Sequence, residues 1–381
     1  MSKRKKTGSK IINLSQKILT WLGLGIPKRS LPQKLLLGFL ILIFVSLGTM
    51  YGIARYYIAK HANEPFVFGA TFSPHYARGF GLNPQQTMDA IINDLGIKRL
   101  RLVSYWDKGE PLPGKYNFSD LDWQFKKAEN SGVDISLAIG LRQPRWPECH
   151  MPAWAAGLPK DVWAEKLKSY MGKVIDRYKD SPALISYQLE NEYFLSVFGN
   201  CPDHSRERLV DEFNFVKSKD PAKPLIVTRS NNAVPSWPIG QPRSDINGAS
   251  IYKRVWDKTV TNRYFEYPVP AWFYAFLAGG AELTTGRDTF IHELQAEAWL
   301  PDNKGFNRSD YRMNDIGSIP EQSKSLNSEN LGQRFDYAVA TGMRTVDLWG
   351  VEWWYWRKIK AHDPSLWDIA RVKIAQYNTR E

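Results

Sequence analysis

Eight short apolar runs, nearly all followed by a helix-like segment, recur along most of the 381-residue chain. They cover residues 66–72, 97–104, 133–140, 183–191, 224–230, 246–252, 288–294 and 345–350. A helix between two strands returns the chain to the same end of the sheet, so consecutive strands should be parallel. Eight such units close into a barrel, and we expect a (β/α)8 TIM barrel.

An open, doubly wound sheet is the alternative arrangement of the same elements. It normally carries a glycine-rich phosphate loop after its first strand. The sequence GATFSPHYARGFG at that position lacks the G-x-G-x-x-G spacing, which favours the barrel. Residues 231–245 are too rich in proline and polar residues for a full helix, and a long polar loop is expected over residues 301–327.

A single apolar stretch near the N-terminus has the length of a bilayer span. Residues 35–54, LLLGFLILIFVSLGTMYGIA, contain no charge, and about 20 such residues cross the hydrocarbon core. A buried globular helix is seldom apolar on all sides. A cleaved signal peptide is the stronger rival, although the stretch is longer than its usual apolar region and no clear cleavage site follows.

Positive charge is concentrated before this stretch. Residues 1–34 hold nine Lys or Arg and no acid, so removing them from the net charge of +12 leaves +3 for the other 347 residues. This distribution argues against a nucleic-acid partner. It places the tail in the cytoplasm and the remainder outside, in a single-pass protein of the cell membrane. The tail could be disordered or could lie on the lipid bilayer as an amphipathic helix.

The expected organisation is therefore a basic cytoplasmic tail (residues 1–34), a transmembrane anchor (35–57), a linker (58–65) and the barrel domain (66–381). The active site of a TIM barrel lies at the C-terminal ends of its strands. Polar and aromatic residues gather at those ends in this chain: Arg101, Trp106, Asn191, Glu192, Tyr252, His292, Glu293, Trp349 and Trp353.

Two of these residues, Glu192 and Glu293, are carboxylates on well-separated strands. A pair of carboxyl groups across an aromatic pocket is what glycoside hydrolysis requires, because one acid protonates the leaving oxygen while the other attacks the sugar or activates water. The chain also holds 15 tryptophans, whose ring faces can stack on sugar rings. The ordinary alternative is that these indoles fill the core or mark a membrane interface.

The segments around both glutamates resemble a known group of enzymes. SYQLENEYF (residues 186–194) resembles the Asn-Glu segment on strand four of clan A retaining glycoside hydrolases, and RDTFIHELQAEAW (287–299) their strand-seven nucleophile segment. In sequence, the first segment is most similar to the β-galactosidase-type families 35 and 42, and it is also similar to the cellulase-like family 5. The resemblance extends over about residues 66–356.

This resemblance implies roles for individual residues. Glu192 would be the general acid/base, Glu293 the nucleophile, and Asn191 a ligand of the sugar 2-hydroxyl. Arg101 and Tyr252 would hold Glu293 ionised, and an aromatic floor would come from Trp353 or Trp349. A retaining enzyme would bring the two carboxyl groups within about 5 Å of each other.

The resemblance leaves the roles of several residues open. Glu297 is the rival of Glu293, which is preferred because it ends the β-like run. Trp106, His75 and His292 are candidate sugar contacts, although a lone histidine is more often structural. Glu190 shares a strand face with Glu192 but lies one step deeper, where it would orient neighbours such as the arginine of strand two.

Cys149 and Cys201 are the only cysteines. They fall in the loops after strands three and four, which are neighbours in a barrel, so we expect a disulfide that joins these loops over the site. We find no cluster with metal-ligand spacing and expect no cofactor.

The function expected from the sequence is a retaining glycosidase that cleaves a β-linked oligo- or polysaccharide outside the membrane. Two alternatives use the same features. A non-catalytic glycan-binding barrel would have no need of paired glutamates, whereas a transglycosylase in polysaccharide processing would use the same residues. The sugar, the linkage and the choice between internal and terminal cleavage stay open.

Overall fold

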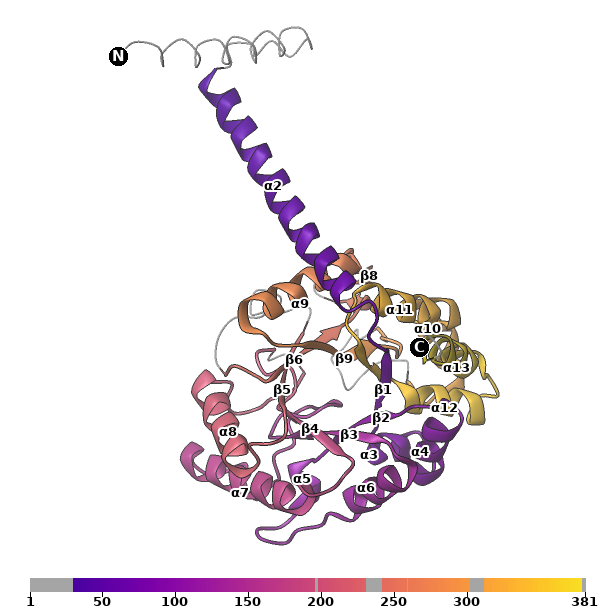
Figure 1. The fold of residues 1–381 in the computed structure, drawn as a ribbon. Coiled ribbons are helices and arrows are strands. Elements are labelled where there is room, and N and C mark those ends of the chain that lie inside the picture. Colours follow the sequence, from indigo (N-terminus) through magenta and orange to yellow (C-terminus); the bar gives the residue numbers. More distant parts are fainter. Residues whose placement is uncertain (1–29, 196–197, 231–241, 259, 302–311, 379–381) are drawn as a thin grey trace, which may run out of the picture. The chain divides into compact units, whose positions relative to one another are not determined.

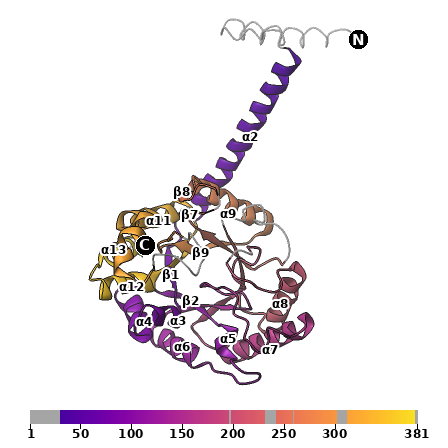
Figure 2. The same cartoon turned by 180° about the vertical axis from the view of Figure 1, so that it is seen from behind.

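A closed barrel of eight parallel strands forms the centre of the molecule (Figure 1). The computed structural model describes residues 30–195, 198–230, 242–258, 260–301 and 312–378. Two compact units divide the chain, residues 1–52 and residues 53–381. The barrel belongs to the second unit, and helices surround its strands in both views (Figures 1 and 2).

The eight barrel strands follow the eight apolar runs of the sequence. They are β1 (Val67–Thr71), β2 (Arg99–Val103), β3 (Asp134–Ile139), β4 (Leu184–Leu189), β5 (Leu225–Ser230), β6 (Ile246–Ile251), β9 (Thr289–Gln295) and β10 (Thr345–Trp349). Each strand pairs in parallel with its neighbours, and β1 closes the ring against β10. The predicted TIM barrel is therefore confirmed, and the open doubly wound sheet is excluded.

Helices connect the strands on the outside of the barrel. They are α4 (Pro84–Asn93), α6 (Ser119–Ser131), α7 (Lys160–Tyr178), α8 (Arg206–Lys219), α9 (Ala271–Thr285), α11 (Ser328–Ala340) and α13 (Ser365–Asn378). The start of α4 has the features expected from the sequence, because the Asn83 side chain accepts hydrogen bonds from the backbone N–H groups of Gln85 and Gln86, and Pro84 occupies the first helical position. The segment 231–241, where a reduced helix was expected, lies outside the described residues.

Several elements that follow the C-terminal ends of the strands were not anticipated. The short helices α3 (Pro74–Gly79), α5 (Trp106–Gly109) and α10 (Ile319–Ser325) fall in connections, and so does the 3-10 turn η2 (Ile316–Ser318). An antiparallel hairpin, β7 (Arg254–Asp257) with β8 (Arg263–Glu266), follows β6. The aromatic run after β10 forms a helix, α12 (Val351–Lys360), and not a strand end. This last difference changes which tryptophans can reach a ligand.

Arg99, His292 and Asp347 form a buried polar cluster between strands β2, β9 and β10 of the barrel. Arg99 Nε lies 3.1 Å from Asp347 Oδ1, and His292 Nδ1 lies 2.5 Å from Asp347 Oδ2. Burial lowers the pKa of His292 to about 4; at Asp347 burial raises the pKa, but the neighbouring Arg99, His292 and Arg101 together lower it to about 2. His292 is therefore neutral and Asp347 ionised at pH 7. Gly69 leaves room for this cluster, because a Cβ there would lie 2.1 Å from Asp347 Oδ1.

We predict that Gly69→Ala destabilises the fold by at least about 3 kcal/mol, because the added methyl group must displace a buried, paired carboxylate. Gly280 in α9 is the matched control. A Cβ there meets nothing within 4 Å, so Gly280→Ala should be neutral or stabilise by up to about 1 kcal/mol. Thermal unfolding of the full chain in detergent compares the two variants, and equal midpoints would contradict the prediction.

One described helix, α2 (Leu31–Lys60), is long and apolar enough to cross a membrane, by length and composition alone. Its last residues belong to the barrel unit. Tyr57 packs on Gly279 of α9, where a Cβ would lie 2.9 Å from that of Tyr57. The next turn continues this contact, because the ring Nε2 of His61 is 2.9 Å from Glu282 Oε2, and Lys60 pairs with the same carboxylate. The end of α2 is thus an integrated part of the barrel unit.

Candidate active site

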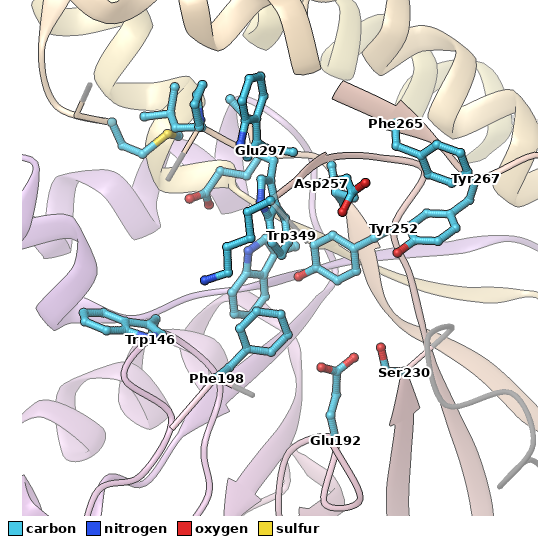
Figure 3. A pocket seen from close by; sticks show the side chains of 18 of the residues that line it. Trp146, Glu192, Phe198, Ser230, Tyr252, Asp257, Phe265, Tyr267, Glu297 and Trp349 are labelled. Carbon is cyan, nitrogen blue, oxygen red and sulfur yellow. The ribbon is translucent and has the colours of Figure 1, made fainter. Parts of the chain in front are cut away.

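Both predicted catalytic glutamates lie at the C-terminal side of the barrel. Glu192 follows β4, and Glu293 lies near the end of β9. A cavity of about 880 Å³ opens over this end and is lined by Glu192, Tyr252 and Trp349 among other residues (Figure 3). Its size is near the upper end of ordinary ligand pockets, which run from about 300 to 1,000 Å³.

Glu293 is buried and contacted by a cation and by hydroxyl groups. Tyr252 donates a hydrogen bond of 2.5 Å to Glu293 Oε1, while Arg101 Nη2 lies 3.4 Å from Oε2. The Ser250 hydroxyl is 3.5 Å from the same Oε2. A cation and two hydroxyl groups are thus directed at one carboxylate. The structure thus places Arg101 and Tyr252 against Glu293, as the sequence predicts.

Glu192 lies in a different environment. Its backbone is in the left-handed region, with φ of 40°, and its N–H donates a 2.8 Å hydrogen bond to the Thr228 hydroxyl. Burial, followed by the charge of Glu293, raises the pKa of Glu192 to about 7. Its Oε1 is buried without a hydrogen-bond partner among the described residues. At neutral pH Glu192 is therefore close to half-protonated, whereas the neighbouring Glu293 has Arg101 as a cationic partner.

Asn191 is held in a fixed orientation beside Glu192. Its side-chain oxygen accepts a hydrogen bond of 3.1 Å from Gln188, and its amide nitrogen donates one of 3.3 Å to Glu148 Oε1. Its backbone carbonyl accepts from Arg142 Nε at 2.7 Å. A fixed amide keeps a defined donor direction, as recognition of a hydroxyl group requires.

Glu148 is a carboxylate of the cavity wall that the sequence analysis did not single out. It lies in the loop after β3, lines the cavity and pairs with Arg142 Nη2 at 2.6 Å. Burial raises its pKa well above the ordinary value; the nearby charge of Arg142 opposes this rise, whereas those of Glu192 and Glu293 add to it. The only signal in the sequence was its position after a strand, which it shares with many loop residues.

Arg145 forms a second group at the cavity wall. Its guanidinium lies 3.7 Å from the ring centre of Tyr76 and 4.0 Å from that of Trp349. It also pairs with Glu297 at 2.6 Å and Glu352 at 2.7 Å. Glu297, the rival of Glu293 in the sequence, thus lines the cavity as the partner of Arg145. The stack fixes the position of the Trp349 indole at the cavity wall, where its face could contact the ring of a ligand.

Five of the predicted sugar contacts do not line the cavity, and the first of them is the fully buried Asn191. Trp353 is fully buried in α12 and donates to Gln322 Oε1 at 3.1 Å. Trp106 is fully buried and donates to Glu110 at 2.9 Å. His292 belongs to the Asp347 cluster in the barrel. His75 is partly exposed beside Asp120, 3.5 Å away. The aromatic floor predicted for Trp353 or Trp349 therefore falls to Trp349, because the helix after β10 turns Trp353 into the core.

Glu190 is structural in the geometry seen here. Its two oxygens accept 2.7 Å hydrogen bonds from the backbone N–H groups of Leu141 and Arg142, and Arg208 Nη1 is 3.1 Å from Oε1. It holds the loop after β3 and does not contact Arg101, which corrects the partner expected from the sequence. Its φ of 55° explains how it turns away from Glu192 in spite of their shared strand parity.

Cys149 and Cys201 are free thiols that hydrogen-bond each other. This contact lowers the pKa of the Cys149 thiol. The two loops also touch through Gly199, where a Cβ would lie 2.9 Å from the Cys149 nitrogen. Among the described residues, no group of three or more His, Cys, Asp or Glu side chains is arranged to hold a metal ion.

Solved structures that resemble this chain include TIM-barrel glycoside hydrolases. A family 5, subfamily 18 glycoside hydrolase from Bifidobacterium longum, in complex with Manβ1-4GlcNAc, matches with a TM-score of 0.55 and 12% identity over 82% of this chain and 79% of that chain. A β-galactosidase from Rahnella sp. R3 matches with a TM-score of 0.51 and 15% identity over 82% and 56%, respectively. At these identities the likeness establishes the shared fold.

Curated proteins give a shorter match. Beta-galactosidase 13 and beta-galactosidase 11 of Arabidopsis thaliana are 28% and 26% identical to the chain over 116 residues. This alignment covers 26% of the chain and only 14% of either plant protein. No protein-family model matches the chain.

The raised pKa of Glu192 predicts a pH-dependent stability difference. Folding raises this pKa from about 4.5 to about 7, so its contribution is fully present below pH 4.5 and is lost as the pH rises through 7. Glu192→Gln, neutral at every pH, should therefore be more stable than the parent at pH 8, by roughly 3 kcal/mol. The difference in stability between Glu192→Gln and the parent should disappear towards pH 4.

Thermal midpoints of the full chain in detergent, measured from pH 4 to pH 8, test this expectation. Glu165→Gln is the control, because the Glu165 side chain is 72% exposed and its replacement should produce no comparable trend. A Glu192→Gln midpoint that stays parallel to the parent over the whole range would show that the carboxyl is not destabilised by burial.

Proposed function

We propose that this protein is a retaining glycoside hydrolase acting on a β-linked glycan. The observation that carries the proposal is the unequal environment of two carboxylates at one end of the barrel. Glu293 has Arg101 and Tyr252 as partners, whereas Glu192 is buried with its pKa raised to about 7. Glycosidases need this division between an ionised nucleophile and a protonated acid. The shared fold of the glycoside hydrolases adds support.

In the first step, Glu293 attacks the anomeric carbon of the bound sugar. A bond forms between this carbon and a Glu293 oxygen, and the bond to the leaving oxygen breaks as Glu192 gives it a proton. The unpaired Oε1 of Glu192 can face the leaving group, because no described residue occupies it. In the proposed complex, the Asn191 amide donates a hydrogen bond to a hydroxyl of the same sugar.

In the second step, the ionised Glu192 takes a proton from water, whose oxygen attacks the anomeric carbon and releases Glu293. The same residue serves as acid and then as base, which a pKa near the working pH allows. A sugar hydroxyl in place of water would make the reaction a transglycosylation. Chromatography of the products with and without an acceptor sugar separates these outcomes, and binding without any product would indicate a glycan-binding barrel.

We further propose that α2 anchors the barrel to the cell membrane. Residues 35–54 carry no charge, and the preceding 34 residues carry nine cations and no acid, which favours a cytoplasmic tail and an outer barrel. In this arrangement residues 35–57 form the anchor, residues 58–65 the linker and residues 66–381 the hydrolase domain. The substrate would be a glycan outside the cell.

The assignment of the nucleophile predicts the position of a covalent label. A 2-deoxy-2-fluoro β-glycoside with a dinitrophenyl leaving group slows the second step more than the first, so a glycosyl-enzyme accumulates. Peptide mapping should place the sugar on Glu293, and Glu293→Gln should abolish both labelling and turnover. A label on Glu297 would overturn the assignment in favour of its neighbour.

The assignment of Glu192 as the acid/base is tested by steady-state kinetics on aryl β-glycosides. Since Glu192 must be protonated for the first step, kcat/KM of the parent should fall tenfold per pH unit above about pH 7. Glu192→Gln should lose about 100- to 10,000-fold with substrates that need protonation of the leaving group. Azide should restore turnover, whereas Glu190→Gln should not respond to azide.

The cysteine pair is proposed to form a disulfide outside the membrane. Each thiol gives up a proton and an electron to a thiol–disulfide oxidant, and an S–S bond joins the loops after β3 and β4. Mass spectrometry of non-reduced peptides, from protein extracted with a thiol-blocking reagent, should find Cys149 and Cys201 in one linked peptide pair. Recovery of two blocked thiols would disprove the link.

A further inference from the structure

The hairpin β7–β8 forms a wall of the cavity that a minimal barrel does not need. Three aromatic residues of this segment, Trp256, Phe265 and Tyr267, line the cavity. Phe265 is 41% exposed, although apolar rings of this size are ordinarily buried. An exposed aromatic surface at the rim of a pocket marks a binding surface.

This hairpin is held firmly in place. Gln295, at the end of β9, accepts hydrogen bonds of 2.8 and 2.9 Å from the backbone N–H groups of Lys253 and Arg254 and returns one of 2.6 Å to the Arg254 carbonyl. Tyr264 reaches α10 through a 2.9 Å bond to Glu321. Because the same strand carries Glu293, the hairpin has a fixed position relative to the catalytic pair.

A second aromatic surface lies on the opposite side of the catalytic acid. Trp146, in the loop after β3, is 44% exposed and lines the same cavity. In Figure 3, Trp146 lies at one side while Phe265 and Tyr267 lie at the other, with Glu192 below the space between them. A ligand that contacts both surfaces must therefore extend past the site of cleavage in both directions.

The charges of the lining do not favour an acidic glycan. Burial raises the pKa of Glu148 and of Glu192 and so favours their neutral forms, and the other carboxylates of the lining, Asp257 and Glu297, are matched in number by the cations Arg145 and Lys258. Arg145 is already paired with two carboxylates. Uronic acid or sulfated units would therefore find no excess of positive charge here, whereas neutral sugars would find acceptors for their hydroxyl groups. The Trp256 indole N–H, buried and without an acceptor in the described part of the chain, adds a donor.

We infer that this chain binds a neutral oligosaccharide segment of several units and cleaves inside it. The β7–β8 hairpin holds sugar units on one side of the scissile bond, and Trp146 holds units on the other. A cavity of about 880 Å³ has room for such a segment. The inference rests on the proposed function for cleavage, whereas the binding of an extended neutral glycan stands on the cavity alone.

The experiment uses the full chain in detergent and a panel of end-labelled, neutral β-linked gluco-, manno-, galacto- and xylo-oligosaccharides from two to six units. Chromatography at early times should show internal fragments, and kcat/KM should rise with length. Phe265→Ala should lower kcat/KM on the longest active substrate roughly threefold to tenfold, the loss expected for one aromatic contact. Its effect on kcat/KM should become smaller as the substrate shortens towards the disaccharide.

Tyr116→Ala is the matched control, because Tyr116 is 37% exposed and is not among the residues of the cavity wall. It should not alter the dependence on length. Release of single terminal sugars from the start, with no gain from length, would overturn the inference and leave the hydrolase proposal standing.

A binding measurement separates the two proposals if turnover is absent. Calorimetry with the same oligosaccharides should then show affinity that grows with length and falls in Phe265→Ala, and this result would support the extended site while removing the hydrolase. Absence of binding at every length, or tighter binding of uronic acid oligomers than of neutral ones, would overturn the inference.

Discussion

The buried guanidinium of Arg101 is the interaction on which the site depends. From β2 it donates to Thr71 on β1 at 2.8 Å and to Gln188 on β4 at 3.2 Å, and it lies 3.4 Å from Glu293 on β9. Its side chain is fully buried, and a buried cation is tolerated only with such partners. One charge thus joins strands β1, β2, β4 and β9, because closure of the barrel brings them within reach of one side chain.

This cation also makes the surroundings of the two carboxylates unequal. Glu293, whose charge acts on Glu192, has Arg101 and Tyr252 as partners. Glu192 is buried near that negative charge and has only weak opposition from neighbouring hydroxyl groups and Arg142, which leaves its pKa near 7. Two identical side chains therefore differ because of what surrounds them, as is usual in acid–base pairs of enzymes.

Around this pair, the connections after the strands supply the groups that would select a ligand. The loop after β3 brings Arg145, Trp146 and Glu148, whereas the insertion after β6 brings the hairpin. Both are tied to the barrel by buried contacts, Glu190 beneath the first and Gln295 beneath the second. Loops on a rigid scaffold are where binding residues concentrate, and here they extend the cavity wall beyond Glu192.

The sequence by itself determined the barrel, because alternating apolar runs and amphipathic helices have few ways to bury their faces. It also determined Glu192 and Glu293 as strand-end residues, since strand order alone brings such ends together. Only the tertiary structure placed Glu148 and Arg145 at the cavity and separated Trp349 from Trp353. Those positions depend on loop paths and on a helix after β10, which contacts between distant segments decide and which no local periodicity records.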